Sequence, residues 1–262
     1  MTESLPSSIR PILRALGVAA VALALGGLPA AAKERVLAAV AANFAEAMAE
    51  IEPLFEDAHP EADLVVTTGS TGKLYAQIKS AAPFDLLLAA DQARPARLEE
   101  EGDAVPGARF TYAVGRLTLW SPDPARIRGD GIAAMTDPET HFIAIANPDL
   151  APYGAAAEQA LAALGIADQV RGKLVMGQNI GQTFSMVATG NAEMGLVALS
   201  AALSPRNAAS GSRWDVPRSA YEPIRQDAAL LNGDNAAARA FLDFLKSDEA
   251  RAVIARFGYG VE

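Results

Sequence analysis

The amino-acid sequence predicts an α/β fold built from mainly parallel sheets. Short apolar runs recur along the chain and alternate with segments whose apolar residues are three or four positions apart, the spacing of one helix face. Such alternation favours parallel strands, because each helix returns the chain to the same edge of the sheet. The run at 84–89 is continuously apolar, which is typical of a strand buried on both faces.

The first part of the chain contains three expected strands, at 36–40, 64–68 and 84–89. A helix is expected from about 44 to 57, because its apolar residues recur at helical spacing, at Phe44, Met48, Ile51 and Phe55. Asn43 stands before this helix with Glu46 three residues on, the spacing of a capping box. We therefore expect the Asn43 side chain to cap the helix.

The second part repeats the alternation. Apolar runs predict further strands near 116–120, 141–146, 173–176, 194–199 and 221–231. An Ala-rich helix begins near Gly154 and is expected to stop at Gly165, since glycine commonly ends helices. The chain closes with a pair of helices expected from about 235 to 257.

Residues 1–32 have the layout of a cleaved secretory signal peptide. Arg10 and Arg14 form a short basic region, an apolar run follows from Ala15 to Leu28, and the small residues 30–32 suit a cleavage site. The alternative is a membrane anchor, but this run is shorter than the roughly 20 apolar residues that a spanning helix needs. We expect a mature chain that begins at Lys33 and works in the periplasm.

Composition and sparse histidines exclude several classes of function. The chain has 31 acidic against 22 basic residues, a net charge of −9, which argues against binding nucleic acid or anionic membranes. It has no cysteine, so no disulfide is needed for stability. His59 and His141 are the only histidines, so an HExxH zinc site is impossible. Ser70 lacks the G-x-S-x-G pattern of hydrolases. We therefore expect no catalytic residue and no metal-cation site.

Four expected strand-to-helix turns share small polar residues and contain no acid. They are 42–43, 70–72, 152–154 and 180–182. In open α/β sheets, ligands bind beyond the carboxyl ends of the strands, and each helix N-terminus there brings unpaired N–H groups and about half a positive charge. The four turns together predict a site for a small anion with several oxygens.

The stretch TTGSTGKLYAQI (67–78) is not a nucleotide-binding P-loop. The position of the first required glycine is Thr67, and the position of the magnesium-binding hydroxyl is Leu74. Acid-free turns suit anions without a proton, such as sulfate, molybdate or tungstate, better than phosphate, which wants an acceptor. Each turn taken alone could simply cap a helix. Lys73 is expected to be a solvated helix lysine, and Tyr153 could be an ordinary surface aromatic.

Six segments together resemble the periplasmic molybdate-binding proteins of ABC transporters, the ModA-like family. They follow in the same order along the whole mature chain: VAANFAEAM (40–48), GSTGKLYAQI (69–78), APFDLLLAAD (82–91), RFTYAVGRLTLWS (109–121), IANPDLAPYG (145–154) and YEPI (221–224). As a set these segments are specific, whereas GSTG alone would be weak.

The resemblance implies a type II periplasmic-binding-protein fold, in which two lobes close over one oxyanion. Lobe I would comprise 33–112 plus 224–262, and lobe II 115–220. The hinge crossovers would lie near 112–115 and 221–226.

Carried over by position, the resemblance implies a set of oxyanion ligands: Ala42, Asn43, Ser70, Thr71, Tyr153 and Ile180, the last through its main-chain N–H. The turn leaves Ser70 and Thr71 as alternatives. Many relatives have serine where Asn43 stands, and some have a ligand tyrosine where Ala198 stands, so the donor set differs from theirs.

We expect a non-catalytic protein without a cofactor that binds molybdate, and also tungstate, as a monomer and delivers it to a membrane permease. Selection against sulfate would depend on cavity size. One alternative keeps the fold and binds sulfate, phosphate or an organic anion. A second is a secreted hydrolase of phosphate or sulfate esters.

Overall fold

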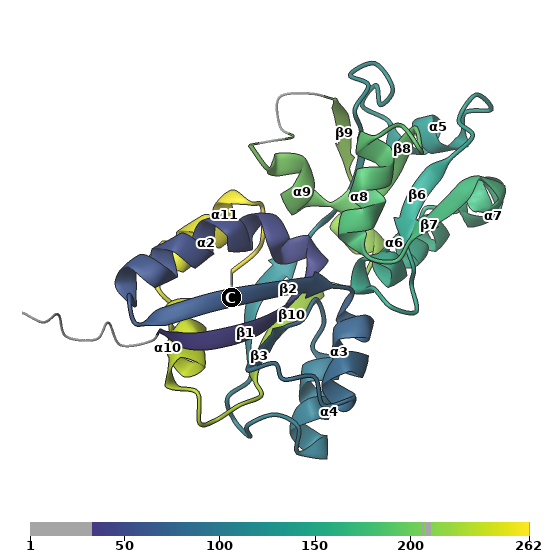
Figure 1. Ribbon diagram of the computed structural model, residues 1–262. Coiled ribbons are helices and arrows are strands. Elements are labelled where there is room, and N and C mark those ends of the chain that lie inside the picture. The colour runs from purple at the N-terminus through teal and green to yellow at the C-terminus, as the bar shows by residue number, and fades with distance from the viewer. Residues whose placement is uncertain (1–32, 206, 208–210, 262) are drawn as a thin grey trace, which may run out of the picture. The chain divides into compact units, whose positions relative to one another are not determined.

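The computed structural model describes residues 33–205, 207 and 211–261. The expected signal peptide, residues 1–32, lies outside these residues. The described chain contains two five-stranded sheets (Figure 1). None of its helices is long and apolar enough to cross a membrane.

The first sheet has the strand order β2-β1-β3-β10-β4. Its strands are β1 (Glu34–Ala41), β2 (Ala62–Gly69), β3 (Leu86–Leu88), β4 (Phe110–Gly115) and β10 (Ile224–Leu230). Strands β1, β2 and β3 are parallel, whereas β10 runs antiparallel to both β3 and β4.

The first sheet is covered on both faces. One core cluster joins residues of β1 to α2 (Ala45–Ala58), α10 (Ala236–Phe244) and α11 (Asp248–Arg256). Another joins the opposite face to α3 (Thr71–Lys79) and α4 (Ala93–Glu101). Successive residues of β1 alternate between the two clusters, as a strand buried on both faces requires.

The second sheet has the order β7-β6-β8-β5-β9. Its strands are β5 (Leu117–Ser121), β6 (Ile143–Ala146), β7 (Leu174–Gly177), β8 (Met194–Ala198) and β9 (Ser212–Asp215). Strands β6, β7 and β8 are parallel, and β5 is antiparallel to β8 and β9.

Helices also cover the second sheet on both faces. One cluster includes residues of α5 (Gly131–Thr136), α6 (Pro152–Ala163) and α7 (Ala167–Val170). The other includes residues of α8 (Ile180–Ala188) and α9 (Leu199–Leu203). Short 3-10 turns lie at Ala42–Phe44 (η2), Arg171–Lys173 (η3) and Arg218–Ala220 (η4). The chain passes from the first sheet to the second directly between β4 and β5.

The two-lobed α/β class is therefore confirmed, with sheets that are mixed because each carries two antiparallel pairings. The predicted strand runs all contain strands, the closing helix pair is present, and Gly165 follows α6 with a left-handed φ of 71°. Strands β4 and β9 and helices α4, α5, α7 and α9 were not predicted.

The expected capping box at Asn43 is wrong. The residue lies inside η2, and α2 begins after Phe44 without a side-chain cap. The Asn43 amide donates instead to Gln226 and Tyr259, and the Glu46 carboxylate accepts from Ser204. Burial of the asparagine explains the failure, because a side chain satisfied by tertiary partners has no need of the helix N–H groups.

Candidate anion-binding site

Strand register brings the four predicted turns to one place. Ala41 of β1 pairs with Gly69 of β2, and Ala146 of β6 pairs with Gly177 of β7, so the turns that follow begin at the same edge of each sheet. A small cavity lies where they meet, lined by Ala41, Ala42, Asn43, Gly69, Ser70, Thr71, Ala90, Ala151, Pro152, Tyr153 and Ile180.

All six residues that the sequence predicted as ligands line this cavity, and no acidic or basic side chain does. Its volume is about 10 Å³, the room of about one water molecule. A tetrahedral oxyanion is larger, so the lining groups must move apart slightly to admit one.

Ser70 and Thr71 each present a hydroxyl with a free proton. Ser70 caps α3, and its Oγ accepts from the Lys73 N–H over 3.4 Å. Thr71 Oγ1 accepts from the Ala90 N–H over 2.9 Å. Because each oxygen already accepts from the main chain, its proton is available for another acceptor. Both hydroxyls therefore suit an anion, and the alternatives that the sequence left open stay open.

Two further turns offer main-chain N–H groups. Ile180 is the first residue of α8, whose N-cap Asn179 accepts from the Gln182 N–H over 2.9 Å. Ala42 and Asn43 open η2. The first N–H groups of a helix have no partner within it, so these positions can bind an anion through the backbone.

The Gly72 N–H, in contrast, is already used. It donates to the Leu150 carbonyl over 2.9 Å, and so links the start of α3 to the loop before α6. Arg94 donates to the preceding carbonyl of that loop, that of Asp149, over 3.2 Å. The turn at 70–72 can therefore offer its two side-chain hydroxyls to an anion, whereas its Gly72 N–H binds the loop before α6. Lys73 is exposed, as expected.

Tyr153 is not a surface aromatic, because only 1% of it is exposed. It lies in the first turn of α6, and its Oη is 3.3 Å from Gln226 Nε2. Burial is the main cause that raises the pKa of Tyr153 well above the ordinary tyrosine value, and the nearby Tyr259 raises it further. The hydroxyl therefore stays protonated at neutral pH and can donate.

The side-chain amide of Asn43 has no proton free to donate to an anion in the cavity. Its Nδ2 donates to Gln226 Oε1 over 2.8 Å and to Tyr259 Oη over 3.1 Å. An amide nitrogen has two protons, and both are occupied. Asn43 can therefore contribute its main-chain N–H directly, and its side chain acts on the site through Gln226.

Gln226 and Tyr259 are the members of this site that sequence reasoning missed. Both are buried and hydrogen-bonded to Asn43, but both lie in the C-terminal part of the chain, far in sequence from the four turns. The only signal was indirect: the segment 221–224, which supported the family resemblance, ends two residues before Gln226.

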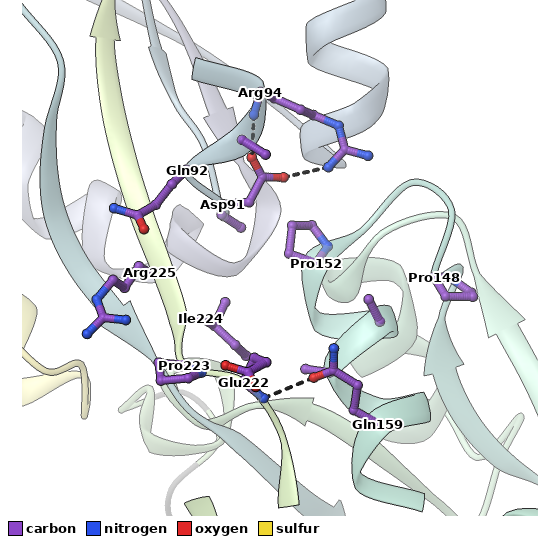
Figure 2. A pocket seen from close by; sticks show the side chains of 14 residues that line it. Asp91, Gln92, Arg94, Pro148, Pro152, Gln159, Glu222, Pro223, Ile224 and Arg225 are labelled. Atoms are coloured by element: carbon purple, nitrogen blue, oxygen red, sulfur yellow. Dashed lines mark hydrogen bonds and ion pairs between the residues drawn. The ribbon is translucent and has the colours of Figure 1, made fainter. Parts of the chain in front are cut away.

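A larger hollow nearby does not suit an anion. Figure 2 shows Asp91 and Arg94 on one side of it and Gln159 and Glu222 on the other. Its volume is about 420 Å³, but the carboxylates of Asp91 and Glu222 line it beside Arg94 and Arg225, and the Arg94 guanidinium is paired with Asp91. Within the described ranges, no group of three or more His, Asp or Glu side chains could hold a metal cation. Ala198, at the buried end of β8, does not line the small cavity.

Known proteins resemble this chain along most of its length. Residues 36–260 match the family described as bacterial extracellular solute-binding proteins. The chain is 48% identical over 249 residues to the molybdate-binding protein ModA of Rhodobacter capsulatus, covering 94% of this chain and 96% of that one. It is 46% identical over 245 residues to ModA of Azotobacter vinelandii, covering 92% and 96%.

Solved structures give the same result. The periplasmic molybdate-binding protein of Azotobacter vinelandii superposes with a TM-score of 0.82 at 35% identity, covering 87% of this chain and 99% of that one. The sulfate-binding protein SubI of Mycobacterium tuberculosis has a TM-score of 0.74 at 12% identity, which shows a shared fold alone. The chain therefore belongs to the family of bacterial extracellular solute-binding proteins, together with the ModA proteins, and is a binding protein rather than an enzyme.

Proposed function

We propose that this chain captures molybdate, and with it tungstate, in the periplasm and delivers the ion to the membrane permease of an ABC transporter. The observation that carries the proposal is the small cavity, where four turns present N–H and O–H groups and no charged side chain. The names of the relatives at 46–48% identity support molybdate as the ligand.

The chemistry of the lining suits an acceptor-only ion. A fully deprotonated tetrahedral dianion needs donors on all sides, whereas hydrogen phosphate also needs an acceptor for its proton. A hydrogen bond to a charged acceptor contributes about 1.5–3 kcal/mol. Several together would offset the association cost of roughly 4–15 kcal/mol. The metal arrives as cargo inside the oxyanion, and we propose no cofactor.

The two sheets suit closure around the ion. We propose that lobe I comprises 33–112 plus 224–262, that lobe II comprises 115–220, and that the crossovers near 112–115 and 221–226 form the hinge. Closure would remove water from the ion and present a joined surface to the permease. We also propose that residues 1–32 direct export and that the mature protein is a monomer.

Thermal unfolding of residues 33–262 with molybdate, tungstate, sulfate and phosphate in turn tests the ligand. A ligand at a thousand times its Kd adds about 4 kcal/mol, equivalent to a rise in Tm of roughly 8–16 °C for a chain of this size. Stabilisation by molybdate and tungstate alone is expected. Stabilisation by sulfate or phosphate alone would overturn the proposed ligand. If no anion acts, elemental analysis for molybdenum and tungsten distinguishes an occupied site from a wrong proposal.

A further inference from the structure

A buried chain of hydrogen bonds runs from the C-terminal segment to the cavity. It passes from Tyr259 to Asn43, then to Gln226 and then to Tyr153. All four side chains are buried, and Gln226 is 0% exposed. This network of hydrogen bonds extends from the first sheet to the start of α6, next to the second sheet. Only its two ends are tyrosines, whose hydroxyls can either donate or accept.

The structure gives each hydrogen bond of this network a direction. Tyr259 Oη donates to the Asn43 main-chain carbonyl over 2.7 Å and lies 3.1 Å from Ser200 Oγ, which donates to the same carbonyl. The Asn43 amide nitrogen donates to the same Oη over 3.1 Å. Gln226 Oε1 accepts from that amide nitrogen over 2.8 Å and from Tyr112 Oη over 3.1 Å.

The hydrogen bond between Gln226 and Tyr153 determines where the Tyr153 hydroxyl directs its proton. With Oε1 turned toward Asn43, Gln226 presents Nε2 to Tyr153 Oη over 3.3 Å. An amide nitrogen only donates, so Tyr153 must accept from it and direct its own proton elsewhere. The Tyr259 oxygen, which Tyr153 also approaches, is a competing acceptor. An anion oxygen in the cavity is the stronger one, because charge strengthens a hydrogen bond.

We propose that Gln226 is a positioning residue that makes Tyr153 an obligatory donor toward the bound anion. Gln226 does not line the cavity, and its side chain forms hydrogen bonds to the lining residues Asn43 and Tyr153 and to the buried Tyr112. The inference rests on the proposed function, and it extends that function to specificity. A hydroxyl locked as a donor favours an oxyanion without a proton and disfavours one that must donate.

The surrounding backbone supports this assignment. The β10 strand shifts register between Gln226 and Asp227, and bulges of this kind re-aim side chains next to functional sites. Gly115 lies against the pair, since a Cβ there would be 2.2 Å from Tyr153 Oη and 2.5 Å from Gln226 Nε2. The bulge at Gln226 and the missing side chain at Gly115 thus leave room for the hydrogen bond between Gln226 and Tyr153.

A double-mutant cycle tests the proposal. Molybdate binding is measured by calorimetry for the wild type, Gln226→Leu, Tyr153→Phe and the double variant. If Gln226 acts through the Tyr153 proton, Gln226→Leu weakens binding about 10- to 150-fold, the worth of a hydrogen bond to a charged acceptor. The same substitution should change affinity less than about 3-fold in the Tyr153→Phe background, because the interacting group is already absent.

Two further variants keep the test decisive. Gln226→Glu has nearly the same shape but can only accept when ionised, so it should draw the Tyr153 proton away from the anion and also weaken binding. Gln159→Leu is the matched control: Gln159 is exposed, accepts from the Glu222 N–H over 2.9 Å (Figure 2) and does not line the small anion-binding cavity. Thermal unfolding of each ligand-free variant shows whether it folds.

The outcomes separate this inference from the proposed function. Failure of the wild type to bind molybdate overturns the proposed function, and the same cycle with sulfate then tests Gln226 independently. If the wild type binds but Gln226→Leu loses the same factor in both backgrounds, Gln226 has a merely structural role and the inference is overturned. Wild-type affinity in Gln226→Glu would also contradict it.

Discussion

Gly115→Ala is the sharpest structural perturbation of this site, although Gly115 does not line the cavity. It is the last residue of β4, and an added Cβ would stand 2.2 Å from Tyr153 Oη and 2.5 Å from Gln226 Nε2, well inside the 3.0 Å that real Cβ atoms keep. The Tyr153 ring is rigid and buried, so it cannot swing away as a surface side chain would. It has to shift by roughly 1 Å, and the hydrogen bond to Gln226 is lost or lengthened.

The expected magnitude follows from these contacts. Overpacking of a buried site costs about 1–3 kcal/mol, which lowers the Tm of the ligand-free protein by about 2–12 °C for a chain of this size. The displaced hydroxyl also loses its alignment with the anion, and a hydrogen bond to a charged acceptor is worth about 1.5–3 kcal/mol. Affinity for molybdate should therefore fall about 10- to 150-fold.

Calorimetric titration with molybdate and thermal unfolding without ligand measure the two effects separately. Gly172→Ala is the control, because a Cβ at 172 meets nothing within 4 Å and the residue does not have a left-handed backbone. It should leave both quantities unchanged. Wild-type affinity in a folded Gly115→Ala protein would refute the reasoning, since it would mean that the position of the Tyr153 hydroxyl does not matter to the anion.

Two other predictions concern alkaline stability and the contact between α3 and the facing loop. Burial raises the pKa of Tyr259 to about 12, against an unfolded value of about 10, so its contribution of about 3 kcal/mol is fully present below pH 10 and is lost as the pH rises toward 12. Denaturant unfolding between pH 9 and 12 should accordingly show a shallower loss of stability in Tyr259→Phe than in the wild type, and equal slopes would contradict the assignment. Gly72→Ala would place a Cβ 3.1 Å from the Leu150 carbonyl that the Gly72 N–H binds. It should weaken molybdate binding roughly 2- to 10-fold, the worth of one ordinary hydrogen bond, and a titration with no such loss would show that this contact does not support the site.

The sequence was a good guide to the fold because the apolar runs are buried on both faces. Strand β1 and the run at 84–89 read as continuous hydrophobic segments, and both lie at the centre of the first sheet. The same signal could not show direction. Strand β10 lies within the predicted run at 221–231 although Arg225, Gln226 and Asp227 interrupt its apolar residues, and its antiparallel pairing depends on where the chain crosses between sheets. Strand β9 was missed because it is short, at an edge and polar, Ser212–Asp215.

The candidate site divides in the same way. The four turns could be predicted because they lie at helix starts, where N–H groups are unpaired, and the family resemblance then supplied the six individual residues. Helix capping by Asn43 was a reasonable local prediction that tertiary contacts override. Gln226 and Tyr259 could not be found, since nothing in their local sequence distinguishes a buried polar partner from a surface residue.

A cavity without charged side chains places unusual demands on its neighbours. A lysine attracts an anion from almost any orientation, but a hydroxyl helps only when its proton points at the ligand, and it weakens binding when a lone pair does. Neutral donors must therefore be held by a surrounding shell that fixes their direction. Here that shell reaches from Tyr259 through Asn43 and Gln226 to Tyr153. It follows that substitutions which leave every lining residue in place should still change the affinity for an anion, and that such changes should depend on whether Tyr153 keeps its hydroxyl.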